Sequence, residues 1–547
     1  MLLMNFETEY LYYGLAVTLL SVVLFAYLCP SILHGLQMSN YRWAEYKAYY
    51  KRVGHSQFYR LCYLSFLSTI SMGVFAVAAL SLDKLAHWGT VGVSKLGFLL
   101  FLFFCVLYGA VNKKEKQLQK TPLRYTPRVK RLLASVCVCE LLVSGCVIAL
   151  VPTQFAYVVM GLVPLCVLPL CVFANWLCSP WERHIAKGFV KVAQAKLARQ
   201  KQTDQKPQVI GITGSFGKTT AKNILAGMLS KKYSVCMSPQ NYNTPMGLCK
   251  TINNHYDGQD ILLLEMGARY RGDIQELCQI VGLDFCMLTS VGDCHLETFL
   301  TRQAIVDTKC DIVSGLLQEG KAVVCKDPAV VQKLKDDQRV TFADSESECI
   351  QKVCADGQGT QWSQVLCGQT VQMQTKLLGE HIPKLVAMCA RLAVMLEVPA
   401  ADIVEAVGEL QPIPHRLQLI QSTVGSDTVV IDDAYNANLA SVQVALQVLS
   451  QFVGYQKVVI TPGLVELGKQ ETEQNKMVGQ AIAKHCDAAI LVGSRAEQIN
   501  AGCEITKQQG KECFVQIVPD RDKAMTALKA VQGKKVVLFC NDLPDSF

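Results

Sequence analysis

Gly211-Ile-Thr-Gly-Ser-Phe-Gly-Lys-Thr-Thr220 is the stretch that decides the fold of the larger part of this 547-residue chain. It follows an apolar run, Val209–Ile212, and leads into a helix-forming stretch, Ala221–Leu229. A strand, a glycine-rich loop and a helix in this order are typical of a phosphate-binding loop. Gly214 and Gly217 would allow backbone N–H groups to approach phosphate oxygens closely. The sequence therefore predicts a nucleotide-binding α/β domain.

The end of this loop adds charge and a metal ligand. Lys218 would bring a point charge to the phosphates, and the Thr219 hydroxyl suits Mg²⁺. The helix N-terminus that follows also favours anions. Gly211 lies one residue too early for the common GxxxxGK[ST] spacing, and a chance glycine-rich turn is the alternative. We assign nucleotide contacts to Gly214, Ser215, Gly217, Lys218, Thr219 and Thr220.

Downstream of residue 207, short β-branched runs alternate with amphipathic stretches. This alternation predicts α/β domains with largely parallel sheets. The polar section 340–378 is expected to form an antiparallel edge, and Gln411-Pro-Ile-Pro414 a hinge between two domains. We predict strands at 208–213, 261–265, 284–290, 321–325, 428–433, 457–461, 488–492 and 535–540.

The first third of the chain has a different composition. The chain carries 53 Lys+Arg and 45 Asp+Glu; residues 1–180 have a net charge of +9 and the rest −1. Because the basic residues lie in the most apolar third, a basic nucleic-acid-binding domain is disfavoured. Five apolar runs there approach the ~20 residues that a helix needs to cross a bilayer. We predict transmembrane helices at about 11–29, 61–82, 96–111, 132–151 and 155–175.

Basic loops follow the first and third runs, which predicts a multi-pass plasma-membrane protein with cytoplasmic catalytic domains. These loops could instead bind anionic lipid. Glu140 would either be functional or lie protonated against a neighbouring helix. Residues 181–206 form a basic amphipathic linker, expected as a surface-lying or plain linker helix. None of the 24 cysteines forms a CxxC pair, so we expect reduced thiols.

Several segments resemble, in order, those of the Mur ligases, the ATP-dependent amide ligases of cell-wall precursor synthesis. The likeness covers about residues 207–540 and is greatest to the D-alanyl-D-alanine-adding type, MurF. Besides the loop, the matching segments are Glu265-Met-Gly-Ala268, Thr289–Glu297, Lys309, His415-Arg-Leu-Gln418, Asp432-Asp-Ala-Tyr-Asn-Ala-Asn438 and Val465-Glu-Leu-Gly468.

The resemblance implies a domain order and a reaction. Residues 207–412 would form the central ATP-binding domain and 413–547 a Rossmann-like C-terminal domain, while the membrane region 1–180 replaces the family's uridine-nucleotide domain. A carboxylate would attack the γ-phosphorus of ATP to give an acyl phosphate, and an amine would then displace phosphate. The donor is expected to be lipid-linked or UDP-linked, and the acceptor an amino acid or a dipeptide of the D-Ala-D-Ala type.

The resemblance also implies roles for single residues. Catalytic roles fall to Lys218, His295 and Lys309. Metal ligands would be Thr219, Glu265, His295 and, once carbamylated, Lys309. Further nucleotide contacts would come from Arg416, Asp433, Asn436 and Asn438, and substrate contacts from Asn241, Asn243 and Thr244. A structural histidine, a surface lysine and a plain turn are the alternatives for His295, Lys309 and the 241–247 loop.

Two departures leave the substrates open. Gly379-Glu-His-Ile-Pro-Lys384 lacks the asparagine of the family's adenine-site motif, and Phe539–Phe547 lacks its terminal Lys-Gly-Ser-Arg. We expect a membrane-anchored ligase of envelope precursors that uses ATP and Mg²⁺. The alternatives are a polyglutamate-type or other amino-acid ligase, and a transporter or membrane scaffold with a degenerate nucleotide domain. The intact Gly217-Lys-Thr-Thr220 argues against degeneration.

Overall fold

The computed structural model falls into two compact units, of which one ends at Ile185 and the other runs from Ala186 to Pro544. Each unit is described by itself below. The predicted membrane runs at 61–82 and 96–111, and nearly all of the run at 11–29, lie outside the described residues. The structure describes residues 29–52, 123–151, 166–203, 206–239, 242–343, 349–421, 427–434, 437–465, 467, 470–508, 510 and 513–540.

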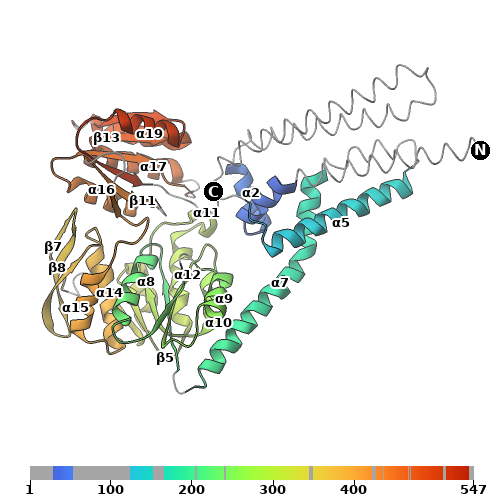
Figure 1. Cartoon of the computed structure of the whole chain (residues 1–547), viewed down its shortest axis with the longest axis horizontal. Helices are drawn as coiled ribbons and strands as arrows, with labels where there is room; N and C mark the ends of the chain where they lie inside the picture. The colour runs from blue at the N-terminus through green and yellow to red at the C-terminus, as the bar shows by residue number, and fades with distance from the viewer. Residues whose placement is uncertain are drawn as a thin grey trace, which may run out of the picture. The chain divides into compact units, whose positions relative to one another are not determined.

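The described part of the first unit is helical. It contains α2 (Trp43–Arg52), α5 (Pro127–Leu150) and the first part of α7 (Val167–Gln200) (Figure 1). α5 begins where the Thr126 hydroxyl accepts the N–H of Val129, with a proline in the first turn. Arg131 on α5 donates two hydrogen bonds, of 2.7 and 2.9 Å, to the Glu182 carboxylate of α7. This bidentate ion pair joins the two helices.

Glu140 is fully buried on α5 and accepts a 3.0 Å hydrogen bond from the Ser144 hydroxyl. Three cations, Arg128, Lys130 and Arg131, lie in the first turns of the same helix. In the part of the chain that the structure describes, no helix combines the length and the apolar character needed to cross a membrane. We therefore correct two predictions: the N-terminal transmembrane region of the fold and the multi-pass plasma-membrane location derived from it.

The second unit begins with the rest of α7, ahead of the predicted domain start at residue 207. Ala193 and Leu197 of this helix are buried in the core of the domain that follows. The Gln194 side chain donates to the carbonyl of Gln279 at 3.0 Å. This part of the predicted linker is thus a helix that packs on the central domain.

A six-stranded parallel sheet forms the centre of this domain, in the order β2-β3-β1-β4-β5-β6. Its strands are β1 (Gln208–Thr213), β2 (Val235–Met237), β3 (Ile261–Glu265), β4 (Leu283–Leu288), β5 (Leu316–Cys325) and β6 (Val340–Ala343). Its helices are α8 (Lys218–Leu229), α9 (Pro245–Asn254), α10 (Asp273–Val281), α11 (Leu296–Phe299), α12 (Arg302–Ser314), α13 (Pro328–Leu334), α14 (Ile382–Met395) and α15 (Ala400–Glu409).

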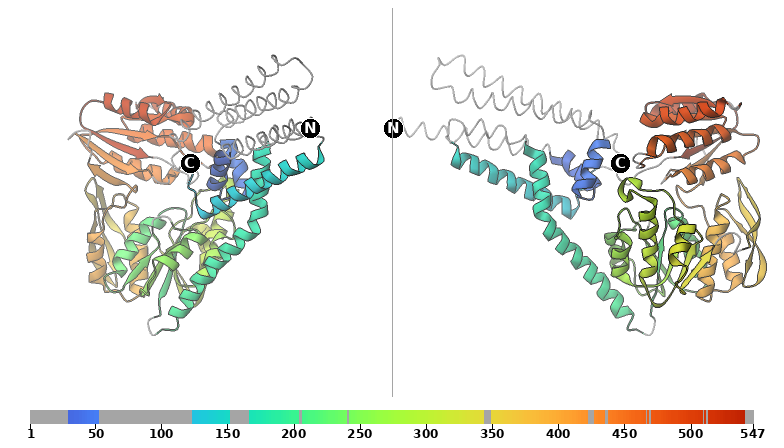
Figure 2. Two further views of the ribbon diagram at one scale, coloured as in Figure 1. Left: turned by 45° about the vertical axis from the view of Figure 1, so that its right-hand side comes forward. Right: turned by 180° about the vertical axis from the view of Figure 1, so that it is seen from behind.

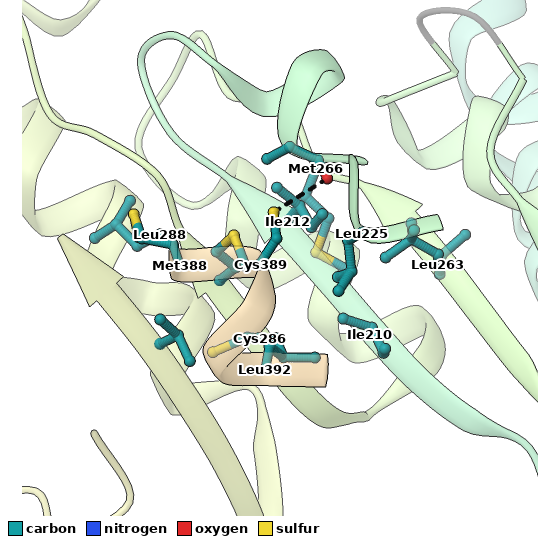
Figure 3. Close-up of a cluster of buried hydrophobic side chains, with 14 of the residues drawn as sticks. Ile210, Ile212, Leu225, Leu263, Met266, Cys286, Leu288, Met388, Cys389 and Leu392 are labelled. Atoms are coloured by element: carbon teal, nitrogen blue, oxygen red, sulfur yellow. Dashed lines mark hydrogen bonds between the residues drawn. The ribbon is translucent and has the colours of Figure 1, made fainter. Parts of the chain in front are cut away.

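The register of this sheet places the functional segments together. Ile212 of β1 pairs with Glu265 of β3, and Thr213 pairs with Leu288 of β4. The loops that follow these three strands therefore leave from the same edge of the sheet, where α/β proteins bind ligands. Figure 3 shows the apolar core beneath them, in which Ile212 of β1, Leu225 of α8 and Met388 of α14 pack together.

Residues 351–375 form a separate antiparallel sheet of three strands. These are β7 (Gln351–Asp356), β8 (Gly359–Leu366) and β9 (Gln369–Thr375), in the order β7-β8-β9. The prediction of an antiparallel edge in 340–378 differs from this arrangement, because only β6 joins the main sheet and it does so in parallel. A run of alternating polar residues indicates a half-exposed strand but not the sheet that it joins.

The C-terminal domain is a second α/β layer structure. Its sheet has the order β10-β11-β15-β12-β13-β14, and only β10 is antiparallel to its neighbour. Helices cover both faces (Figures 1 and 2), with a core on each side. Its elements are β10 (Gln418–Gln421), β11 (Thr428–Asp433), α16 (Leu439–Ser450), β12 (Gln456–Thr461), α17 (Glu471–His485), β13 (Ala488–Val492), α18 (Ala496–Lys507), β14 (Phe514–Val518), α19 (Arg521–Ala530) and β15 (Lys535–Cys540). The predicted α/β class with largely parallel sheets is confirmed.

Helices α17 and α18 touch through their backbones at two glycines. A Cβ on Gly479 would lie 1.9 Å from the Ile499 carbonyl oxygen, and a Cβ on Gly502 would lie 1.9 Å from that of Lys476. We expect Gly502→Ala to destabilise the protein by about 1–3 kcal/mol, since the helices must separate. The midpoint of urea unfolding measures this effect.

Gly408→Ala is the matched control for this substitution. Gly408 also lies inside a helix, but the nearest atom to its Cβ would be the Gln374 carbonyl oxygen at 3.9 Å. Alanine there is expected to leave the midpoint unchanged or to raise it slightly. Equal midpoints for Gly502→Ala and Gly408→Ala would contradict the close contact.

Candidate active site

The backbone conformation of the phosphate loop depends on two glycines and on contacts with the segment after β4. Gly217 has a left-handed backbone, with φ of 80°, and precedes α8. A Cβ on Gly214 would lie 2.1 Å from the Thr289 hydroxyl oxygen, so only glycine fits there. The Ser215 N–H donates to the Ser290 carbonyl at 2.9 Å, and the Thr289 hydroxyl donates to the Phe216 carbonyl at 2.6 Å. These contacts fix the shape of the loop.

Three side chains at the start of α8 point in different directions. The Lys218 ammonium donates to the Gly214 carbonyl at 2.8 Å, which places it across the loop. The Thr219 hydroxyl donates to a carboxylate oxygen of Glu265 at 3.0 Å. Thr220 is buried, so its side chain faces the domain core. Lys218 and Thr219 are thus the two that face the space expected for phosphate and metal.

Glu265, at the end of β3, is a buried carboxylate that gathers several partners. It is 2% exposed, and its Oε2 lies 3.2 Å from the Lys222 ammonium as well as near Thr219. Its Oε1 accepts a hydrogen bond from the Asn243 amide at 3.4 Å. Its backbone N–H donates to the Ser238 hydroxyl at 3.0 Å. The structure therefore brings together predicted metal, nucleotide and substrate residues.

Lys222 and Ser238 are partners of Glu265 that the sequence analysis missed: Lys222 contacts the carboxylate, and the Ser238 hydroxyl accepts the backbone N–H. Lys222 lies one helical turn after Lys218, so helical spacing alone places both on one side of α8. Glu265 ends an apolar strand, so its carboxylate could be expected to be buried, and a buried carboxylate needs a charged or hydrogen-bonding partner. Ser238 follows the short strand β2 and offered no such signal.

Lys309 is a buried lysine on α12, with 1% of its surface exposed. Burial, together with the nearby cation of Lys218, lowers its pKa to about 8, although Cys294 and Asp273 act in the opposite direction. The surface-lysine alternative does not fit this burial. An amine with this pKa is partly neutral near pH 8, which makes it nucleophilic.

His295 is half-buried at the start of α11 with a left-handed backbone, φ 51°. Its carbonyl accepts the N–H groups of Thr298 and Phe299, both at 3.0 Å. The backbone of the predicted metal ligand is thereby fixed. It lies between β4 and α11, within the segment Thr289–Glu297 that resembles the family.

The donor set around Glu265 fits Mg²⁺. Within the described ranges, no three His, Cys, Asp or Glu side chains gather closely enough to hold a metal by themselves. Mg²⁺ commonly takes only one or two protein carboxylates, and completes its shell with phosphate and water oxygens. The Thr219 hydroxyl and the Glu265 carboxylate, 3.0 Å apart, are oxygen donors of this kind.

The second group of predicted residues lies at the start of the C-terminal domain. His415 Nδ1 lies 2.7 Å from an Asp432 carboxylate oxygen. The Leu417 N–H donates to Asp433 at 3.3 Å, and burial raises the pKa of Asp433 to about 6 while Arg416 acts to lower it. His415 and Leu417 both have left-handed backbones. The segment after the predicted hinge is thus tied to the end of β11.

Two predicted contact residues are helix caps. Asn438 accepts the N–H of Ser441 at 2.9 Å and forms a capping box at the start of α16. Thr244 accepts the N–H of Gly247 at 3.3 Å at the start of α9. Asn241 and Asn436 lie outside the described residues. The contacts of these four residues with a ligand stay predictions.

The site combines a phosphate loop, a buried carboxylate and a buried lysine, and a second, largely parallel α/β domain follows it, as expected for a nucleotide-dependent enzyme. The Mur ligase middle domain matches residues 212–390, and the glutamate ligase domain of Mur ligases matches residues 415–541. The chain therefore belongs to the Mur ligase family, and within it resembles the MurF type.

Two curated relatives share the name UDP-N-acetylmuramoyl-tripeptide–D-alanyl-D-alanine ligase. The protein of Bacillus subtilis (strain 168) is 27% identical over 383 residues, which cover 67% of this chain and 83% of that one. The protein of Mycobacterium tuberculosis (strain H37Rv) is 28% identical over 357 residues, which cover 59% and 68%. These relatives connect the chain to the MurF type at the level of sequence.

Solved structures agree with this assignment. MurF of Thermotoga maritima in complex with ADP aligns with a TM-score of 0.57 and 25% identity, covering 66% of this chain and 81% of that one. A MurF structure from Acinetobacter baumannii aligns with a TM-score of 0.58 and 22% identity, covering 65% and 78%, and supports the fold alone.

Proposed function

We propose that this chain joins the carboxylate of a UDP-linked muramoyl peptide to the amine of a dipeptide of the D-Ala-D-Ala type, with release of ADP and phosphate. The observation that carries this proposal is the 3.0 Å contact between Thr219 of the phosphate loop and the buried Glu265 carboxylate. The substrates follow from the names of the curated relatives.

The phosphate loop would bind and orient ATP in the first step. The backbone N–H groups at Gly214–Gly217 and the Lys218 ammonium neutralise the triphosphate as the donor carboxylate oxygen attacks the γ-phosphorus. Ser215 and Thr220 would contribute backbone N–H groups to the same cradle. Thr219 and Glu265 would hold Mg²⁺, which supplies charge neutralisation when it is bound.

Lys309 would act after modification by carbon dioxide. The neutral amine attacks the carbon of CO₂, an N–C bond forms, and one N–H proton passes to water, leaving an anionic carbamate. The low pKa of the buried amine, about 8, supports this step. The carbamate would then place two oxygen ligands near His295, where an unmodified ammonium would repel a metal.

The C-terminal domain would complete the site. We propose that Arg416, Asp433, Asn436 and Asn438 contact the nucleotide or substrate, and that Asn241, Asn243 and Thr244 contact the substrate. The Asn243 amide beside Glu265 supports a substrate loop at this place. Closure of the second domain would exclude water, which otherwise hydrolyses an acyl phosphate.

An isotope experiment tests the chemistry directly. A donor carboxylate labelled with ¹⁸O transfers one labelled oxygen to the γ-phosphorus, and that oxygen leaves in the released phosphate when the amine attacks. We expect ¹⁸O in phosphate, and ADP release that requires both donor and amine. D-Ala-D-Ala, glutamate and a diamino acid are offered as competing acceptors. Full-rate ADP release without an amine, or unlabelled phosphate, would count against the proposal.

A further inference from the structure

We propose that Lys222 is a positioning residue that fixes the Glu265 carboxylate for metal binding and ties the substrate loop to the phosphate loop. This inference rests on the proposed function, because it assigns Lys222 a part in the same site. Lys222 and Glu265 side chains are only 2% and 3% exposed, and their charged atoms lie 3.2 Å apart. Lys222 lies behind the carboxylate and is not available to a nucleotide.

The contacts of Lys222 close a ring that joins three elements. Its ammonium donates to the Ser238 carbonyl at 2.8 Å. The Ser238 hydroxyl accepts the Glu265 N–H at 3.0 Å, and the Glu265 carboxylate returns to Lys222. The ring links α8, the loop after β2 and the end of β3. Lys222 thus contacts the carboxylate while Ser238 holds the backbone of the same residue, and the oxygen that Lys222 contacts also accepts the Thr219 hydroxyl.

The same ring reaches the predicted substrate loop. Asn243 follows Ser238 in the loop between β2 and α9, and its amide donates to the other oxygen of Glu265. Its carbonyl also accepts the Gly267 N–H at 2.8 Å. Lys222 therefore sets the position of one carboxylate that both the phosphate loop and the substrate loop touch.

A buried ion pair of this kind is poorly explained by stability alone. Desolvation of two charges offsets most of their attraction, and well-packed apolar pairs are often at least as stable. Removing a side chain that orients a metal ligand typically lowers metal affinity or activity ~10–100-fold. The ion pair is therefore better explained by placement of the carboxylate.

The test compares Lys222→Met with the wild-type protein and with Lys231→Met. Lys231 makes surface ion pairs with Glu405 and Glu409, so its replacement removes a lysine ion pair outside the site. The readouts are the dissociation constant for Mg²⁺ in the presence of ADP, measured by calorimetry, and the Mg²⁺ concentration that gives half-maximal ADP release at saturating ATP. For Lys222→Met we expect both values to rise at least ~10-fold, with kcat partly restored at high Mg²⁺. Lys231→Met should match the wild type.

The outcomes separate the two proposals. Absence of Mg²⁺-dependent ADP release in the wild type would overturn the proposed function. Normal Mg²⁺ dependence in Lys222→Met, beside an active wild type, would overturn only the role of Lys222. Lower turnover with unchanged Mg²⁺ dependence would show a merely structural role, and would overturn it as well.

A second variant covers the case in which Lys222→Met does not fold. Lys222→Met combined with Glu265→Gln leaves no unpaired buried charge, so this protein is expected to fold. If Lys222 acts through the carboxylate, the double variant should behave like Glu265→Gln in both turnover and Mg²⁺ dependence. A further loss of ~10-fold or more in the double variant would overturn the inference.

Discussion

Lys218→Ala is expected to lower the turnover of the ligase at least ~10²–10³-fold, the usual effect of removing a preorganised charge from the site of a developing anion. The Lys218 ammonium donates to the Gly214 carbonyl at 2.8 Å and so lies across the phosphate loop. The charge on the γ-phosphoryl group would then lack the cation of the phosphate loop. ADP release at saturating substrates measures the effect.

The fold should tolerate this change. Lys218 is half-buried at the first position of α8, and its side chain lies across the loop and not in the apolar core. Lys231→Ala, at an exposed ion pair after the same helix, serves as the control and should keep normal turnover. More than a tenth of wild-type turnover in Lys218→Ala, with an intact fold, would remove this lysine from the mechanism.

Lys309→Ala is expected to lower turnover at least ~10²-fold, because it removes the proposed anionic ligand. The alanine leaves space in a buried position, so acetate or another small carboxylate should restore part of the activity. Lys309→Met fills that space and should not respond to acetate. Loss of activity that acetate does not restore in Lys309→Ala would favour a structural lysine.

The pKa of Lys309 gives this prediction a pH dependence. With a pKa of about 8, its amine is about half neutral at pH 8, whereas an ordinary lysine is only about 0.4% neutral. Protonation removes the nucleophilic lone pair, so carbamylation should decline as the pH falls below about 8. The ¹³C NMR signal of protein equilibrated with ¹³C-labelled bicarbonate reports the carbamate. A signal that is unchanged in Lys309→Ala would place the carbamate elsewhere.

Local pattern was enough to predict much of the fold. Five strands, among them Ile261–Glu265 and Thr428–Asp433, have the predicted bounds, because buried parallel strands form nearly continuous apolar runs. Strand β14, Phe514–Val518, was not predicted; it lies at a sheet edge, where most of its side chains are exposed or partly exposed. Strand β2 has only three residues, too few for a pattern.

The sequence predicted those site residues that belong to one recognisable segment, and it did not predict contacts between distant segments. The phosphate loop, Glu265 and Lys309 each belong to a recognisable segment, and the register of β1, β3 and β4 brings the first two together. The ring through Lys222 and Ser238 depends on contacts between distant segments, which sequence spacing does not reveal. The transmembrane prediction was wrong, since no helix among the described residues combines the length and the apolar character of a membrane span. On α5, Glu140 is buried and hydrogen-bonded to Ser144.

The end of α7 limits how far the chain can be shortened. Ala193 and Leu197 are fully or almost fully covered by the central domain. A fragment that starts at residue 207 would expose the apolar surface of the central domain on which α7 packs, and exposed apolar surface promotes aggregation. A fragment that starts at Ala186 keeps the end of α7 packed on the central domain and is the better starting point for crystallisation.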